Sequence, residues 1–296
     1  MNRSLSARPQ PPAPTRFTFA DLTLARRLER AEGTSCRRSV EARARVFPER
    51  GATWTEIAGA YAMFDGPDSP ITQTFGLGLF EAPSAETLTA IEHFYDERGA
   101  PAFHEVSPLA DMQTFTLLNA RGYQPFEFTS VMYRGLETGE DGQEARAGQD
   151  RDGHITIRRA GPDDAEVYAR TAAEGWREFG FAEFIYDMAR VYAASEGVDI
   201  FLAELDGRAI ATGVLSIHAG VAHLAGASTI PAGRRRGAQN ALLDHRLRYA
   251  AERGCDIALM GALPGSSSQR NAERNGFRIA YTRLKFQRRV DPASGG

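Results

Sequence analysis

Two stretches of this chain repeat one order of sequence signals, and the repetition constrains the fold more than any other feature. Glu97-Arg98-Gly99 recurs 155 residues later as Glu252-Arg253-Gly254, and Arg121-Gly122-Tyr123 is matched 154 residues later by Asn275-Gly276-Phe277. In both stretches a helical pattern precedes Glu-Arg-Gly. A short strand, a proline-containing loop, a second helix and a β-rich stretch follow it. Glycine is common just beyond any helix, but the matched spacing and order favour a duplication.

Polar segments of low complexity divide the chain. The first 16 residues are rich in arginine, serine and proline, and a run of Gly, Asp, Glu and Gln follows the first repeat. Neither segment has the apolar periodicity of a packed element. We therefore expect a flexible tail at 1–16, a first body at 17–136, a linker at 137–152, a second body at 153–290 and a loose end at 291–296.

Strand and helix patterns follow one another in a clear order along the second body. The class expected for each body is α/β (α+β), with a mixed and mostly antiparallel central sheet flanked by helices. The expected strands of the second body are His154–Arg159, Ile200–Leu205, Ala209–Ile217, Val221–Thr229, Asp256–Gly261 and Arg278–Phe286, and its main helices are Pro162–Trp176, Glu183–Ala194 and Ala238–Ala251. Pro101–Val106 and Phe126–Arg134 are the corresponding strands of the first body.

An arginine-rich turn joins the expected strand Val221–Thr229 to the next helix, in the order Ile230-Pro231-Ala232-Gly233-Arg234-Arg235-Arg236-Gly237-Ala238. A helix N-terminus directs free backbone N–H groups and a partial positive charge at an anion, and guanidinium groups bind phosphate in forked pairs. The turn is neither a Walker loop nor a G-x-G-x-x-G fingerprint, because both patterns are absent. It predicts a diphosphate site, and the alternative is a basic surface turn.

The turn resembles the acyl-CoA signature of the GNAT N-acetyltransferase superfamily, with Arg234, Gly237 and Gln239 in the three key positions; Gln239 replaces the usual small residue. The resemblance covers about residues 153–290 and implies acetyl-CoA as co-substrate, held in a splayed gap between two strands. It implies that Arg234, Arg235, Arg236, Gly237, Ala238, Gln239 and Asn240 hold the pyrophosphate. It further implies that Ser228, Thr229 and Ile230 align the pantetheine arm, and that Asn271 supports the donor.

The first body is also similar to a GNAT domain, most clearly in its latter half. Its counterpart of the turn, Gln73–Phe80, has no arginine, and apolar residues follow its glycines. We therefore expect a tandem protein whose first copy is degenerate for CoA and packs against the active copy.

The sequence signals for proton-transfer residues are weaker than those for the CoA-binding turn. The family's usual tyrosine, five residues before the phenylalanine, is replaced by Ala272. Tyr281 is the candidate substitute for the general acid. His223 and Glu174 are candidate bases, and Glu183 and Asp187 also border the expected acceptor site; deprotonation through water is a further alternative. The aromatic residues that could line an acceptor pocket, or equally a core, are Trp176, Phe179, Phe181, Phe184 and Tyr186.

Composition excludes several classes. The net charge of −3 gives no global case for nucleic acid or an anionic membrane, and no apolar run approaches a membrane span. Cys36 and Cys255 form no metal pattern, so we expect no metal and a reducing, cytoplasmic location.

The sequence thus predicts an acetyl-CoA-dependent N-acetyltransferase that acts directly on a small-molecule or peptide amine. A non-catalytic CoA-binding or regulatory protein is the alternative. A nucleic-acid-binding protein is a weaker rival, and a larger acyl group and a homodimer are both left open.

Overall fold

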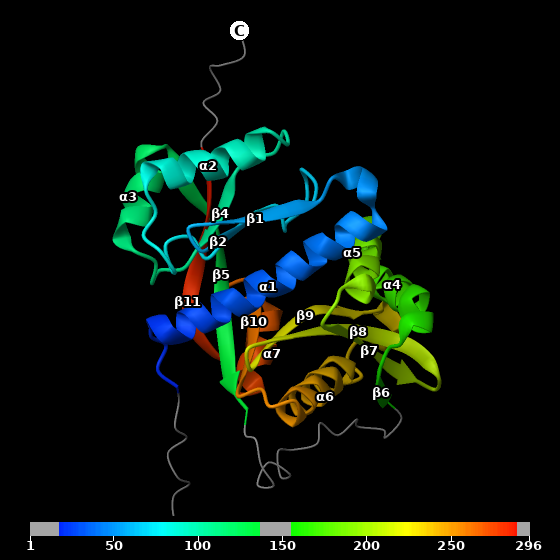
Figure 1. The fold of residues 1–296 in the computed structure, drawn as a ribbon. Helices are drawn as coiled ribbons and strands as arrows, with labels where there is room; N and C mark the ends of the chain where they lie inside the picture. Colours follow the sequence, from blue (N-terminus) through cyan, green and yellow to red (C-terminus); the bar gives the residue numbers. More distant parts are fainter. Residues whose placement is uncertain (1–17, 137–154, 289–296) are drawn as a thin grey trace, which may run out of the picture.

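All strands of the described residues form one continuous mixed sheet. The computed structural model describes residues 18–136 and 155–288, and the sheet runs in the order β1-β2-β3-β4-β11-β5-β10-β9-β8-β7-β6 (Figure 1). Only the β3–β4 and β9–β10 pairs are parallel within this part of the chain. The strands are β1 Thr53–Ile57, β2 Ala60–Phe64, β3 Gln73–Phe75, β4 Phe103–Val106, β5 Tyr123–Gly135, β6 Ile155–Arg159, β7 Val198–Leu205, β8 Arg208–His218, β9 Val221–Thr229, β10 Ile257–Ala262 and β11 Arg278–Arg288.

The two halves exchange their last strands. β5, the final strand of the first half, pairs with β10, whereas β11, the final strand of the second half, pairs with β4. β5 and β11 also pair with each other along most of their length. The repeat in the sequence is therefore visible in the order of elements, but each copy completes the sheet of the other. The expected bodies 17–136 and 153–290 are continuous in sequence, but in the structure they share one sheet and are not separate units. The expected tails and linker lie outside the described residues.

Helices cover both faces of the sheet. α6 packs on one face of β7, β8 and β9, and α4 and α5 pack on the other (Figure 1). α1 runs across the centre of the molecule and contacts β1 and β2 of the first half as well as β8, β9 and α5 of the second. The helices are α1 Leu22–Val46, α2 Ala85–Asp96, α3 Met112–Ala120, α4 Ala165–Glu174, α5 Ala182–Ala194, α6 Ala238–Glu252 and α7 Ser267–Arg274, with short 3₁₀ turns at Pro48–Arg50, Pro162–Asp164, Arg177–Phe179 and Pro231–Gly233.

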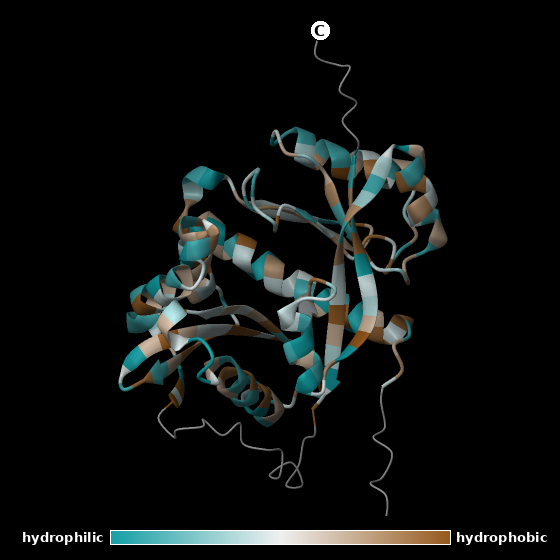
Figure 2. Ribbon diagram, turned by 180° about the vertical axis from the view of Figure 1, so that it is seen from behind, coloured by the Kyte–Doolittle hydropathy of each residue, from teal (hydrophilic) through white to brown (hydrophobic). Residues whose placement is uncertain are grey.

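The mostly antiparallel sheet with flanking helices confirms the predicted fold class. β9 has the predicted bounds, and α6 ends one residue later than expected. The helix expected at 162–176 is shorter, because Pro162–Asp164 forms a 3₁₀ turn and α4 ends at Glu174. Bands of hydrophilic and hydrophobic residues along the helices (Figure 2) match their position between core and solvent.

Candidate functional site

β9 separates from β10 halfway along its length. The two strands pair only from Ile257–Val221 to Leu259–His223, so the end of β9 has no partner on this side among the described residues. On its other side β9 carries a bulge, because pairing with β8 passes from Ala225 directly to Ser228. Gly226 at the bulge has a φ of +58°, and a methyl group there would lie 2.4 Å from the Val214 side chain. The bulge therefore requires glycine, and it opens the predicted splayed gap.

The arginine-rich turn lies at the end of the gap. α6 begins after Gly237, which has a φ of +85° and gives the helix no side-chain cap. The first backbone N–H groups of α6 are thus left to face an anion. Arg235 and Arg236 are exposed, and neither has a carboxylate partner within the described ranges. This arrangement supplies the free charge and the free donors that a diphosphate needs.

Two side chains of the turn are structural. Arg234 donates to the Glu178 carboxylate at 2.6 Å and to the Gly175 carbonyl at 3.2 Å, so it joins the turn to the segment after α4. The Gln239 side-chain amide donates to the Ser228 carbonyl at 2.7 Å and to the Thr229 hydroxyl at 2.9 Å. The residue that departs from the family's small-residue pattern therefore fixes α6 to the end of β9.

The remaining residues expected to bind pantetheine or pyrophosphate differ in their burial and contacts. Ser228 is buried and donates its hydroxyl to the Ala172 carbonyl at 2.7 Å, which secures α4 against β9. Ile230 is buried, and its backbone N–H donates to the Ile210 carbonyl. Ala238 is also buried, whereas Asn240 is exposed on the first turn of α6. These contacts fix the position of the end of β9, whose β10 side has no strand partner among the described residues.

α7 carries Ala272 at the position where a tyrosine was expected. Ala272 is fully buried in the same core cluster as Phe277. Asn271 is half-buried, and its side-chain amide makes no hydrogen bond among the described residues. Ser266 caps the helix by accepting from the Gln269 backbone N–H. α7 thus presents an amide donor and acceptor, but no acid.

The corresponding region of the first half is closed. Leu77 and Leu79, in the segment between β3 and α2, are buried in the core. Ser84 caps α2 through a capping box with Thr87, so the N-terminus of that helix already has an acceptor. The first half therefore presents neither arginines nor an uncapped helix N-terminus at this position.

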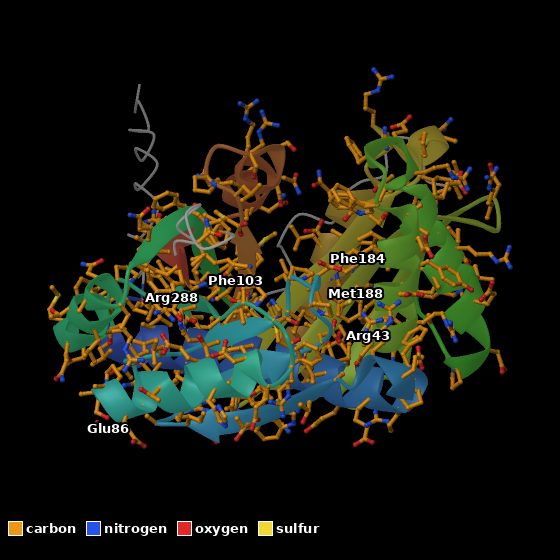
Figure 3. The ribbon with its side chains drawn as sticks, turned by 90° about the horizontal axis from the view of Figure 1, so that it is seen from above. Arg43, Glu86, Phe103, Phe184, Met188 and Arg288 are labelled. Atoms are coloured by element: carbon orange, nitrogen blue, oxygen red, sulfur yellow. The ribbon has the colours of Figure 1, made fainter. Side chains whose placement is uncertain are left out.

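A pocket of 210 Å³, here called the α4–α5 pocket, opens beside the β9 bulge. Its walls come from α4, α5, the bulge and the segment between β2 and β3, so both halves of the chain contribute. Figure 3 shows Phe184 and Met188 of α5 with Arg43 beside them. The lining residues are Pro70, Ile71, Tyr168, Ala172, Trp176, Phe184, Ile185, Met188, Ala189, Tyr192, Gly226, Ala227 and Ser228.

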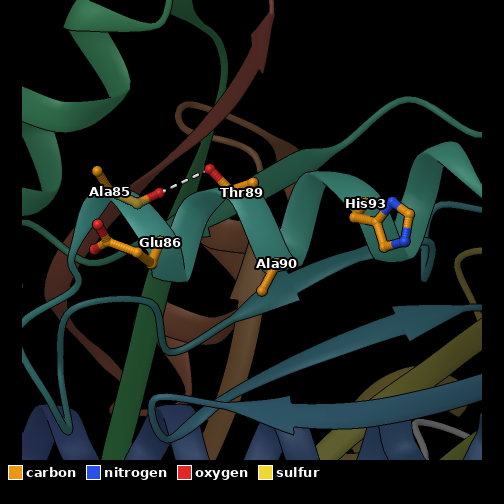
Figure 4. Close-up of a pocket in the computed structure, with 5 residues that line it drawn as sticks. All are labelled: Ala85, Glu86, Thr89, Ala90 and His93. Carbon is orange, nitrogen blue, oxygen red and sulfur yellow. Dashed lines mark hydrogen bonds between the residues drawn. The ribbon is translucent and has the colours of Figure 1, made fainter.

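The hollow on the outer face of α2 has a different character. It is lined by Ala85, Glu86, Thr89, Ala90 and His93, all from one helix (Figure 4). No second element of the described chain lines it, and it lies in the other half of the sheet from the arginine-rich turn. Although it measures 350 Å³, larger than the α4–α5 pocket, it has no converging groups for chemistry.

None of the three predicted catalytic side chains lines the α4–α5 pocket. The Tyr281 hydroxyl donates to Glu29 at 2.9 Å in a buried cluster with Arg283, Glu32 and Glu105. His223 is buried where β9 and β10 part; burial lowers its pKa and Glu32 partly opposes this effect. Glu174 ends α4, where no described residue binds its carboxylate. Of the expected aromatic residues, only Trp176 and Phe184 belong to the pocket, because Phe179 and Phe181 are exposed and Tyr186 binds Glu166.

Two buried residues near the bulge were missed by the sequence reasoning. The Arg246 guanidinium lies under the bulge and donates to the Val214 and Ala225 carbonyls at 2.9 and 3.2 Å. Burial lowers its pKa to about 10. The Tyr168 hydroxyl would lie 3.5 Å from a methyl group placed on Gly226. An arginine on the apolar face of α6 was the available signal, whereas a tyrosine on an amphipathic helix gives none.

Within residues 18–136 and 155–288, no group of three or more His, Cys, Asp and Glu side chains could hold a metal ion. None of the helices in these ranges is long and apolar enough to cross a membrane.

Comparison with known proteins gives the same fold. The model of the acetyltransferase (GNAT) family matches residues 166–277, and no curated protein matches the sequence. A GCN5-related N-acetyltransferase from Kribbella flavida is 15% identical, with a TM-score of 0.57 over 86% of this chain and 96% of that one. A GCN5-related N-acetyltransferase from Sphaerobacter thermophilus is 18% identical (TM-score 0.52; 74% and 72% covered).

A tandem GNAT protein from the clavulanic acid biosynthesis pathway is 12% identical, with a TM-score of 0.52 over 79% of each chain. Together with the family match, this likeness confirms the predicted GNAT fold and its tandem form.

Proposed function

Residues 166–277 form a domain of the acetyltransferase (GNAT) family, and from this premise we propose that the chain transfers an acetyl group from acetyl-CoA directly to an amine. The observation that carries the proposal is a set of three features adjacent along the chain, here called the path: the bulge of β9, its splayed end and the N-terminus of α6 without a side-chain cap. A long donor with a diphosphate at one end and a thioester at the other fits such a path. The second half of the chain holds this path, and the first half is closed at the equivalent position.

Each part of the path has a role in the proposal. The N-terminus of α6 with Arg235 and Arg236 binds the pyrophosphate, and Arg234 and Gln239 keep the turn in place. The end of β9 at Ser228 to Ile230, which has no strand partner on the β10 side among the described residues, aligns the pantetheine arm, and Asn271 supports it from α7. Arg246 lies under the bulge with its charge unpaired by any carboxylate among its described contacts, which favours negative charge that develops on the thioester.

The transfer needs no covalent enzyme intermediate. The amine nitrogen attacks the thioester carbonyl, the new C–N bond forms, and the C–S bond breaks. The nitrogen loses one proton and the sulfur of CoA leaves as thiol or thiolate. Two partners held in the correct orientation make this step effectively intramolecular, which is the main contribution expected from the site.

Calorimetric titration with acetyl-CoA, CoA and desulfo-CoA tests the donor site. We expect micromolar binding with one site per chain. Two sites per chain would contradict the silence of the first half, and no binding would remove the donor site altogether. A panel of amines with thiol release as the readout then tests the transfer.

A second candidate is a CoA-binding or regulatory protein without turnover. It is favoured by Ala272, which is locked in the core, and by Tyr281, which is held by Glu29. Stoichiometric CoA binding with no acetylated product from any amine would support it. As further parts of the proposal, the protein acts in the cytoplasm, in keeping with its free Cys36 and Cys255, and a homodimer is an additional expectation.

A further inference from the structure

The described lining of the α4–α5 pocket contains no charged side chain. The ionic groups behind it neutralise one another: buried Arg43 and Asp65 pair at 2.9 Å, and Arg43 also donates to the Met188 sulfur at 2.8 Å. The Asp187 carboxylate, next to Met188 on α5, accepts a hydrogen bond from Arg50. A polycationic acceptor would therefore meet no carboxylate in the pocket.

The pocket has the size and walls for a ring. Trp176, Phe184 and Tyr192 supply aromatic surface, and Ile71 closes the pocket from the first half of the chain. Its volume is 210 Å³. An apolar protein cavity of about 150 Å³ holds benzene. The α4–α5 pocket thus has room for a six-membered ring and a short aliphatic arm.

Two polar groups of the pocket, the hydroxyls of Tyr168 and Tyr192, are neutral and unengaged, whereas the Ser228 hydroxyl is bound to the Ala172 carbonyl. The hydroxyls of Tyr168 and Tyr192 make no hydrogen bond within the described residues, and burial raises the pKa of both phenols. A neutral phenol accepts a hydrogen bond from an amine N–H, but it cannot balance an ammonium charge. Moving an unpaired ammonium from water into such a site is costly, so the free base is the form that enters.

From these observations we infer that the acceptor is an apolar, ring-bearing primary amine that binds in the α4–α5 pocket as the uncharged free base. The inference rests on the proposed acetyl transfer and names the class of its acceptor. Tyr168 lies against Gly226 at the bulge, so its hydroxyl positions the nitrogen beside the gap that would hold the thioester.

The proton balance follows from this entry. The ammonium loses its first proton to water before it binds. The second proton leaves nitrogen as the C–N bond forms, and it goes to the departing sulfur or to solvent. No carboxylate base is needed, because desolvation selects a nitrogen that is already nucleophilic.

The first test compares amines with the intact protein and acetyl-CoA. 2-Phenylethylamine should be acetylated with a kcat/KM at least tenfold above that for spermidine or kanamycin. The reverse order would overturn the acceptor class and leave acetyl transfer standing. If neither set gives product while acetyl-CoA binds, the proposed function is overturned. Quenching of Trp176 fluorescence by 2-phenylethylamine then decides the pocket separately, with a Trp176→Phe variant to identify the signal: loss of the quenching in this variant supports the ring-binding pocket, and absence of quenching in the unaltered protein overturns it.

The second test separates desolvation from a protein base. In 2,2-difluoro-2-phenylethylamine the fluorine atoms lower the amine pKa with little change in shape. The midpoint of kcat/KM against pH should follow the amine pKa from one substrate to the other. A midpoint that stays fixed for both amines would show that a protein group removes the proton, and would overturn entry as the free base.

Variants locate the binding. Ala189→Phe fills the pocket and should raise KM for 2-phenylethylamine at least tenfold while the affinity for CoA is unchanged. Phe184→Ala removes a ring wall without overpacking and should have the same direction of effect. Phe126→Ala is the matched control, because this exposed phenylalanine of β5 packs on Phe103 away from the pocket. Unchanged KM in both pocket variants would overturn the assignment.

Discussion

Gln239 in the first turn of α6 donates its side-chain amide to the backbone carbonyl of Ser228 across 2.7 Å, and so ties the N-terminal end of the helix to the strand that borders the gap. The same amide reaches the Thr229 hydroxyl at 2.9 Å. The position of the turn relative to β9 therefore depends in part on the Gln239 side chain.

Replacing this amide should loosen the turn. Gln239→Leu leaves the Ser228 carbonyl without its side-chain donor, which should lower the free energy of unfolding by about 1–3 kcal/mol. We also expect several-fold weaker CoA binding, measured by calorimetry beside urea unfolding. Gln113→Leu, on exposed α3, is the control and should change neither quantity.

The exposed charge of the turn should control CoA affinity. Arg235→Glu with Gly237→Asp places carboxylates where the pyrophosphate would bind, and should raise Kd for CoA at least about tenfold, or about 1.4 kcal/mol. Circular dichroism should show an intact fold, although Asp at the positive φ of Gly237 introduces some strain. Arg208→Glu changes an exposed arginine in the β7–β8 hairpin and serves as the control. Equal affinity in all three proteins would remove the turn from the binding site.

The buried cluster under α1 should make stability depend on pH. Burial raises the pKa of Glu29 to about 7, against 4.5 for an ordinary glutamate. Between these values the folded protein holds the proton that the unfolded chain releases, so the contribution of Glu29 to stability falls as pH rises from about 4.5 through about 7.

Glu29→Gln removes this dependence. The stability of the variant relative to the unaltered protein should increase between pH 5 and pH 8, by at most about 3 kcal/mol. Urea unfolding at each pH measures the difference, with exposed Glu49→Gln as the control. A difference that is flat with pH would contradict the raised pKa.

The exchanged strands should hold the halves together after the chain is cut. A protease site inserted between residues 136 and 155 should give two fragments that elute as one species in native buffer, because β5 and β11 each pair with the opposite half. Fragment 155–296 expressed alone lacks the β5 partner of β10 and should aggregate. Elution as two separate folded fragments would disprove the interdependence.

Local signals in the sequence predicted much of the second half. The strand pattern of Val221–Thr229 and the glycine of each Glu-Arg-Gly sequence fix backbone conformation over a few residues, and the structure has β9 and the ends of the preceding helices where they were expected. The exchange of β5 and β11 was not predictable in this way. Both strands have the pattern of a half-buried strand, and that pattern does not specify which neighbour each will pair with.

The candidate site likewise has one part that local sequence predicts and one part that it does not. The arginine-rich turn is contiguous in sequence, so its motif could be recognised directly. The α4–α5 pocket joins Ile71, Tyr168, Phe184 and Gly226 from four separate segments. Tyr281 was expected near the donor, but its hydroxyl is held by Glu29 from a helix 252 residues away in sequence. Such long-range partners determine whether a tyrosine is catalytic or structural, and local patterns do not contain them.

The position of β11 also has a consequence for synthesis on the ribosome. β11 is the last strand of the described chain to be translated, yet it lies in the middle of the sheet between β4 and β5. Until residues 278–288 have emerged, β4 has an open edge that could pair with a nascent neighbour. A nonsense mutation shortly before Arg278 would therefore remove a central strand instead of trimming an edge, and would leave two incomplete sheets from a single lost segment.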